Sequence, residues 1–101
     1  MTLVKVCTVD ELRDGKSKCV SQKGKEFAVF NVKGKYFCVN NSCTHLGGPL
    51  CEGNLSGKVI TCPWHGAQFD VTTGKVLSGP AGENVQTHVV VIQGRTIFID
   101  V

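Results

Sequence analysis

Cys43-Thr44-His45-Leu46-Gly47-Gly48 and Cys62-Pro63-Trp64-His65-Gly66 are the two stretches that decide the fold of this chain. Sixteen residues separate His45 from Cys62, and each stretch contains one cysteine and one histidine and ends in glycine. Cysteine is often only a small core residue. That explanation does not account for two Cys–His pairs in glycine-containing segments. Because thiolate and imidazole are common metal ligands, the pattern predicts a metal centre.

Two kinds of metal centre fit these four side chains. Structural zinc accepts two cysteines and two histidines, but its paired ligands are usually separated by two to four residues. Only one residue separates Cys43 from His45, which suits two side chains that reach different ions. A [2Fe–2S] cluster with cysteines on one iron and histidines on the other takes one ligand of each type from each stretch. The spacing favours the two-iron centre, and zinc stays as the alternative.

The sequence resembles the Rieske family at this point, most clearly over residues 40–80. The stretches that carry the resemblance are Cys43–Gly48, Cys62–Gly66, the continuation Gln-Phe-Asp-Val-Thr-Thr-Gly at 68–74, and Gly79-Pro80. The resemblance implies one [2Fe–2S] cluster per chain. It also implies an all-β Rieske fold, an antiparallel β-sandwich or barrel with a small cluster-binding loop subdomain at its tip.

The same resemblance assigns the ligands and the domain. It implies that Cys43 and Cys62 bind the inner iron, and that His45 and His65 bind the outer, more exposed iron. A chain of 101 residues is long enough for one domain. We therefore expect a single Rieske domain over 1–101, with the cluster-binding subdomain at about 40–80.

The pattern of short runs and glycine turns independently predicts an antiparallel β structure. Hairpins are expected around Lys33-Gly34 and Gln93-Gly94, and a turn is expected at 72–74. A short helix is expected from Thr8 to Gly15, with Glu11 at the capping-box position. Residues 40–57 read as a long functional loop. In the last hairpin, the alternation at 85–92 predicts one fully buried face, to which Val89 belongs.

Composition excludes several classes of protein. The net charge is +3 and no basic patch with interleaved aromatic residues is present, so nucleic-acid binding is not expected. No apolar run approaches the ~20 residues of a membrane span, and no signal-like leader is present, so we expect a cytoplasmic protein. We expect its six cysteines to be metal ligands or core residues rather than a disulfide scaffold. We also expect Cys51→Ser to matter little.

Four further positions indicate the kind of Rieske centre. Members of respiratory cytochrome complexes carry an extra cysteine in each ligand loop, joined as a disulfide; Gly48 and Trp64 occupy those positions here. High-potential members also place a serine and a tyrosine that donate to sulfur, where Ala67 and Phe69 stand here. Because fewer donors stabilise the reduced cluster less, we expect a low potential, roughly −150 mV.

The resemblance implies a soluble Rieske-type ferredoxin, an electron carrier that is not catalytic alone. Its partners would be a flavin- or NAD(P)H-dependent reductase and the terminal oxygenase of an aromatic-ring dioxygenase or related system. A mononuclear iron site needs two histidines and a carboxylate, and only His88 is left over. We interpret His88 as an ordinary strand residue. The alternatives are a small Rieske-like subunit of a larger reductase, such as nitrite reductase, and a structural zinc module.

Overall fold

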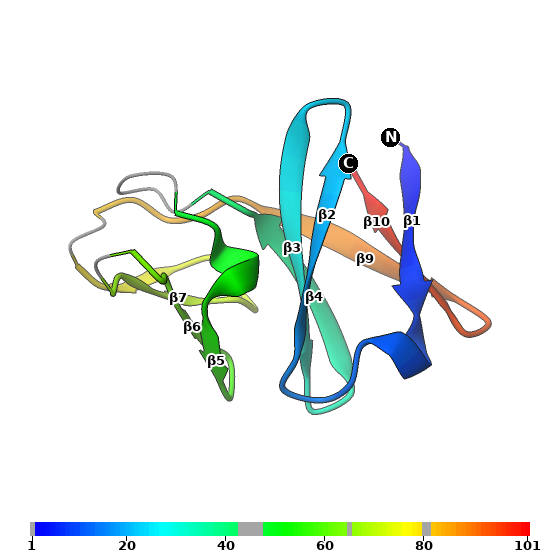
Figure 1. Ribbon diagram of the computed structural model, residues 1–101, viewed down its shortest axis with the longest axis horizontal. Coiled ribbons are helices and arrows are strands. Elements are labelled where there is room, and N and C mark those ends of the chain that lie inside the picture. Colours follow the sequence, from blue (N-terminus) through cyan, green and yellow to red (C-terminus); the bar gives the residue numbers. More distant parts are fainter. Residues whose placement is uncertain (1, 43–47, 65, 80–81) are drawn as a thin grey trace.

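The computed structural model describes residues 2–42, 48–64, 66–79 and 82–101, which form two antiparallel β-sheets (Figure 1). The larger sheet has the strand order β1-β10-β9-β4-β3-β2, and the smaller sheet has the order β5-β6-β7-β8. The elements are β1 Leu3–Thr8, η1 Val9–Glu11, β2 Ser17–Gln22, β3 Lys25–Val32, β4 Lys35–Asn40, η2 Leu50–Glu52, β5 Asn54–Ser56, β6 Val59–Thr61, β7 Gln68–Asp70, β8 Val76–Ser78, β9 Thr87–Gln93 and β10 Thr96–Asp100. The all-β, antiparallel expectation is confirmed.

The hairpin turns lie where the glycine signals predict them. Lys33 and Gly34 both have positive φ, 53° and 86°, between β3 and β4. Two consecutive positive φ values are typical of the two-residue turns whose twist matches that of the strands. Gly94 (φ 63°) turns the chain between β9 and β10, and Gly74 (φ 79°) lies before β8. These turns fix the register of the sheets.

Three strands and the extent of one helix differ from the expectations. β1, β2 and β5 are strands that the sequence pattern did not predict, and β5 lies inside the expected long loop. The expected helix after Thr8 is a single 3₁₀ turn, η1. The Oε1 atom of Glu11 accepts hydrogen bonds from the backbone N–H of Thr8 at 3.2 Å and from its hydroxyl at 3.0 Å.

Two buried clusters hold the sheets together. One lies within the larger sheet and the η1 segment; its members are Cys7, Leu12, Phe27, Val29, Cys38, Ile97 and Ile99. The other combines residues of β3 and β4 with residues of η2 and the smaller sheet; its members are Ala28, Phe30, Val39, Leu50, Cys51, Ile60, Cys62, Ala67, Phe69, Val71 and Val85. The second cluster therefore attaches the smaller sheet to the larger one.

Two expectations about side chains are wrong. Val89 is 62% exposed, so the predicted face of β9 is not fully buried. Val89 pairs with Asp100 of β10, and Asp100 pairs with Leu3 of β1. Leu3 is also exposed, at 45%. A disulfide joins Cys19 to Cys51, whereas we expected only metal ligands or core residues; Cys51 does lie in a core cluster, but not as a free thiol.

Candidate metal centre

Cys62 lies at the start of the turn between β6 and β7. Its backbone N–H donates to the carbonyl of Ala67 at 2.7 Å, directly beyond the Thr61–Gln68 pair that ends the two strands. Gly66 has a φ of +77°, a conformation that side chains disfavour. The turn from Cys62 to Ala67 is therefore tight, and Cys62 is only 2% exposed.

The two ends of the segment that carries Cys43 and His45 are held together. Ser42 and Pro49 form an isolated antiparallel bridge. The buried Asn41 strengthens this closure, because its backbone carbonyl accepts from Leu50 N–H at 2.8 Å and its Oδ1 accepts from Cys51 N–H at 2.7 Å. The base of the first ligand segment is therefore a fixed part of the fold.

Gly48 brings the first segment against the second. A Cβ atom at position 48 would lie 2.6 Å from the Sγ of Cys62 and 3.1 Å from Cγ of Trp64. Distances below 3.0 Å are not tolerated by real Cβ atoms. Position 48 therefore requires glycine, and the absence of a side chain lets the two segments meet at the Cys62 sulfur.

The structure describes one of the four predicted ligands. Cys62 lies at the meeting point, whereas Cys43, His45 and His65 lie outside the described residues. Ala67 and Phe69 are fully buried in the same core cluster as Cys62. Sequence reasoning missed Asn41, because a lone asparagine after a strand carries no signal of its own.

The turn after β7 is stabilised by Asp70. Its Oδ1 accepts from the backbone N–H of Thr72 at 2.8 Å and from its hydroxyl at 2.6 Å, and its Oδ2 lies 3.4 Å from Lys58 Nζ. Burial raises the pKa of Asp70, but the hydrogen bonds from Thr72 and the ammonium of Lys58 outweigh it, so the pKa lies below its ordinary value. Asp70 thus has a structural role in the predicted family stretch 68–74.

His88 has a structural environment on β9. Its Nε2 lies 2.7 Å from Oδ1 of Asn40, and its ring meets the ring of Phe27 edge-on at 5.0 Å. Burial, with a contribution from Lys25, holds the pKa of His88 below its ordinary value. The interpretation of His88 as a strand residue agrees with these contacts.

The surface beside the candidate centre carries little charge. Trp64 is 49% exposed, and residues 59–69 contain no charged side chain.

Among the described residues, no helix has the length and apolarity needed to cross a membrane.

The residues present fit a cluster with mixed cysteine and histidine ligands. The first segment, held at its base by Asn41, contributes one cysteine and one histidine in sequence, and so does the hairpin after β6. Gly48 adds no side chain of its own beside the Cys62 sulfur. Within the same hairpin, Trp64 is exposed, whereas Cys62 is buried.

Comparisons with known sequences point to one family. The Rieske [2Fe-2S] domain model matches residues 2–89. The biphenyl dioxygenase ferredoxin subunit of Pseudomonas sp. (strain KKS102) is 40% identical over 101 residues, covering 99% of this chain and 93% of the relative. The ferredoxin component of the naphthalene 1,2-dioxygenase system of Pseudomonas aeruginosa is 38% identical, covering 89% and 86%.

Solved structures show the same fold. The ferredoxin of carbazole 1,9a-dioxygenase from Nocardioides aromaticivorans superposes with a TM-score of 0.91 at 30% identity, covering 98% of this chain and 97% of that one. A chain in the complex of reduced oxygenase and oxidised ferredoxin in carbazole 1,9a-dioxygenase gives a TM-score of 0.93 at 31% identity, covering 96% and 91%. The chain therefore belongs to the Rieske [2Fe–2S] domain family and carries one [2Fe–2S] cluster.

Proposed function

We propose that this protein is a one-electron carrier that passes electrons from a flavin- or NAD(P)H-dependent reductase to the terminal oxygenase of an aromatic-ring dioxygenase-type system. The relatives matched over nearly their whole length are ferredoxin components. Dicamba monooxygenase, by contrast, shares only the fold, and this chain covers 32% of it. On this proposal the protein does not catalyse bond chemistry alone.

We propose Cys43 and Cys62 as ligands of the inner iron, and His45 and His65 as ligands of the outer iron. The observation that carries this assignment is the approach of Gly48 to the Sγ of Cys62. It brings the end of the first ligand segment to the one described ligand of the second. When bound, the cluster supplies storage for one electron.

The chain's own residues set the environment of that electron. The buried cluster that contains Cys62, Ala67 and Phe69 keeps water from the cysteine side. Neither Ala67 nor Phe69 has a hydroxyl to donate to sulfur, which supports a low potential. The exposed Trp64 and the uncharged stretch around it offer a small, partly apolar surface for brief docking with redox partners.

We further propose that residues 1–101 act as one Rieske domain in the cytoplasm, with a cluster-binding subdomain at about 40–80. The smaller sheet and η2 lie within that range. The buried cluster that joins the two sheets supports a single unit.

The ligand assignment is tested by iron and acid-labile sulfide analysis with an EPR spectrum of the dithionite-reduced protein. Cys43→Ser and Cys62→Ser should lose the visible and EPR signals of the cluster. Cys7→Ser is a matched control, because Cys7 is buried in the other core. Wild-type spectra and iron content in Cys43→Ser would contradict the assignment.

Electron transfer is tested by mixing the reduced protein with a biphenyl dioxygenase-type terminal oxygenase and following its reoxidation. Trp64→Ala should slow the reaction without loss of the cluster. Val89→Ala is the control, because Val89 is also exposed but lies on β9 of the larger sheet. No electron transfer from the wild-type protein to any oxygenase of this class would argue against the carrier function.

A further inference from the structure

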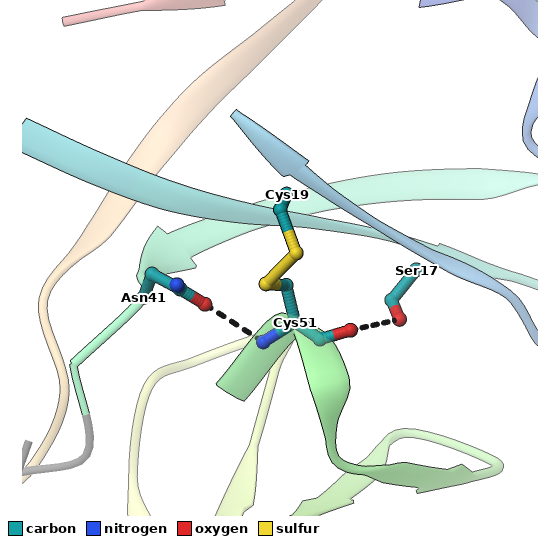
Figure 2. The surroundings of a disulfide bond; sticks show 4 residues. All are labelled: Ser17, Cys19, Asn41 and Cys51. Carbon is teal, nitrogen blue, oxygen red and sulfur yellow. Dashed lines mark hydrogen bonds between the residues drawn. A yellow bond between two sulfur atoms is a disulfide. The ribbon is translucent and has the colours of Figure 1, made fainter. Parts of the chain in front are cut away.

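A disulfide connects the larger sheet with the part of the chain that follows the first ligand segment. It joins Cys19 on β2 to Cys51 in η2, with their Cα atoms 5.2 Å apart (Figure 2). β2 is an edge strand of the larger sheet. The two cysteines are 32 positions apart, and the loop that they close includes Cys43 and His45. The bond therefore crosses from the scaffold to the cluster-binding region.

Backbone contacts hold Cys51 in this place independently of its sulfur. Its N–H donates to Oδ1 of Asn41 at 2.7 Å, and its carbonyl accepts from the hydroxyl of Ser17 at 2.7 Å (Figure 2). Ser17 belongs to β2, the strand that carries Cys19. Because these bonds involve no sulfur atom, reduction leaves both thiols facing each other at a separation suited to a disulfide. The pair is thus arranged to form again after it has been broken.

The two cysteines differ in exposure. Cys19 is exposed, whereas Cys51 is only 7% exposed. Thiol–disulfide exchange requires access of the attacking thiolate to a sulfur atom, so the more exposed residue, Cys19, is the one through which an external thiol would reach the pair. Two other cysteines, Cys7 and Cys38, are buried; burial raises the pKa of both thiols, that of Cys38 to about 12. They do not compete with Cys19 as reactive thiolates.

We propose that Cys19 and Cys51 form a reversible dithiol–disulfide site that exchanges with low-molecular-weight thiols and disulfides through Cys19, and that its oxidised state ties η2 to β2. In the oxidising direction, the Cys19 thiolate attacks glutathione disulfide and releases one glutathione. The Cys51 thiolate then attacks the Cys19 sulfur of the mixed disulfide and releases the second glutathione. Overall, two protein thiols are oxidised to one disulfide and one glutathione disulfide is reduced to two thiols.

The position of the bond gives this site an effect on the cluster. η2 begins at Leu50, shortly after Gly48 and its contact with Cys62. In the reduced state only hydrogen bonds and packing hold η2 on β2, whereas the oxidised state adds a covalent tie. Local opening that exposes a cluster should therefore be rarer in the oxidised protein. This consequence rests on the proposed ligands, but the exchange chemistry does not.

The exchange is tested on the cluster-loaded protein, incubated with reduced glutathione or with glutathione disulfide. Acid quenching, denaturation, maleimide alkylation and mass spectrometry then count the thiols. We expect two fewer thiols after oxidation, restored by reduced glutathione, and a cross-link between fragments containing Cys19 and Cys51. Cys51→Ser should accumulate glutathione on Cys19, and Cys19→Ser should take up none. The control Cys7→Ala should behave as wild type.

Two results of this experiment would overturn the proposal: unchanged thiol counts in wild type, or a disulfide that native protein does not release to reduced glutathione. The tie is tested by iron release to a chelator, which should be several-fold slower from oxidised than from reduced wild type. Cys19→Ser should release iron at one rate under both conditions. Equal rates from the two wild-type forms would refute the tie. Absence of iron from freshly purified protein would instead refute the proposed function, and the thiol counts would still be interpretable.

Discussion

Alanine at position 48 tests whether the two ligand segments meet as tightly as the structure indicates. The added Cβ would lie 2.6 Å from Cys62 Sγ, about 1 Å inside ordinary van der Waals contact. Trp64 is half exposed and can move aside. Cys62 is buried, and its backbone is held by the hydrogen bond to Ala67 at 2.7 Å, so its sulfur has little freedom.

The expected cost is that of overpacking a core, about 1–3 kcal/mol of the free energy of unfolding. For a domain of this size, that corresponds to a melting temperature lower by about 5–20 °C. Because the displaced atom is a proposed ligand, iron and labile sulfide per chain should also fall, and the EPR spectrum of the remaining cluster should change.

The matched control is Gly82→Ala. A Cβ at Gly82 meets no heavy atom within 4 Å, and its φ is not in the left-handed region. Thermal loss of the visible cluster absorption, iron content and EPR are compared for wild type and both variants. If Gly48→Ala matches Gly82→Ala in all three measurements, the contact between the segments is not as close as the structure indicates.

Three further predictions concern neighbouring features. Asn41→Ala leaves the N–H of Cys51 without its acceptor at 2.7 Å. This should lower the free energy of unfolding by about 1–3 kcal/mol and speed iron loss to a chelator. Asn54 is exposed, so Asn54→Ala should change neither quantity. The pKa of His88 is depressed below its ordinary 6.5, so the unfolded state takes up a proton on this side chain at a higher pH than the folded state does. The melting temperature should therefore fall as pH drops below about 6.5. If the melting temperature of His88→Gln fell equally over this pH range, His88 would not be the cause. Phe69→Tyr supplies a hydroxyl in the core that contains Cys62 and should raise the reduction potential, by about 60 mV if it favours the reduced state by ~1.4 kcal/mol. Phe98→Tyr, on β10 of the larger sheet, should leave the potential unchanged.

The sequence predicts those parts of the fold that depend on residues adjacent in the chain. Lys33-Gly34 is a turn because two consecutive positive φ values suit few residue pairs. The spacing of cysteine and histidine within each ligand segment is equally local, and it predicts that the two segments share one centre. In the structure, the chain next to the first segment does reach Cys62, through Gly48.

The features that sequence reasoning missed depend on contacts between distant residues. β2 has the sequence Ser-Lys-Cys-Val-Ser-Gln, which carries little apolar alternation because this edge strand has no fully buried residue. Val89 follows an apolar alternation, yet its side of β9 is exposed. The pairing of Cys19 with Cys51 could not be read from spacing, because cysteine connectivity is not encoded locally.

The reduction potential of the native protein at neutral pH, measured by direct voltammetry, tests the central claim most directly. The account combines histidine ligation of one iron with a cysteine side that lacks hydroxyl donors at Ala67 and Phe69. It predicts a potential at the low end of the Rieske range, roughly −150 mV. A value well above zero would contradict a low-potential cluster and the carrier function built on it.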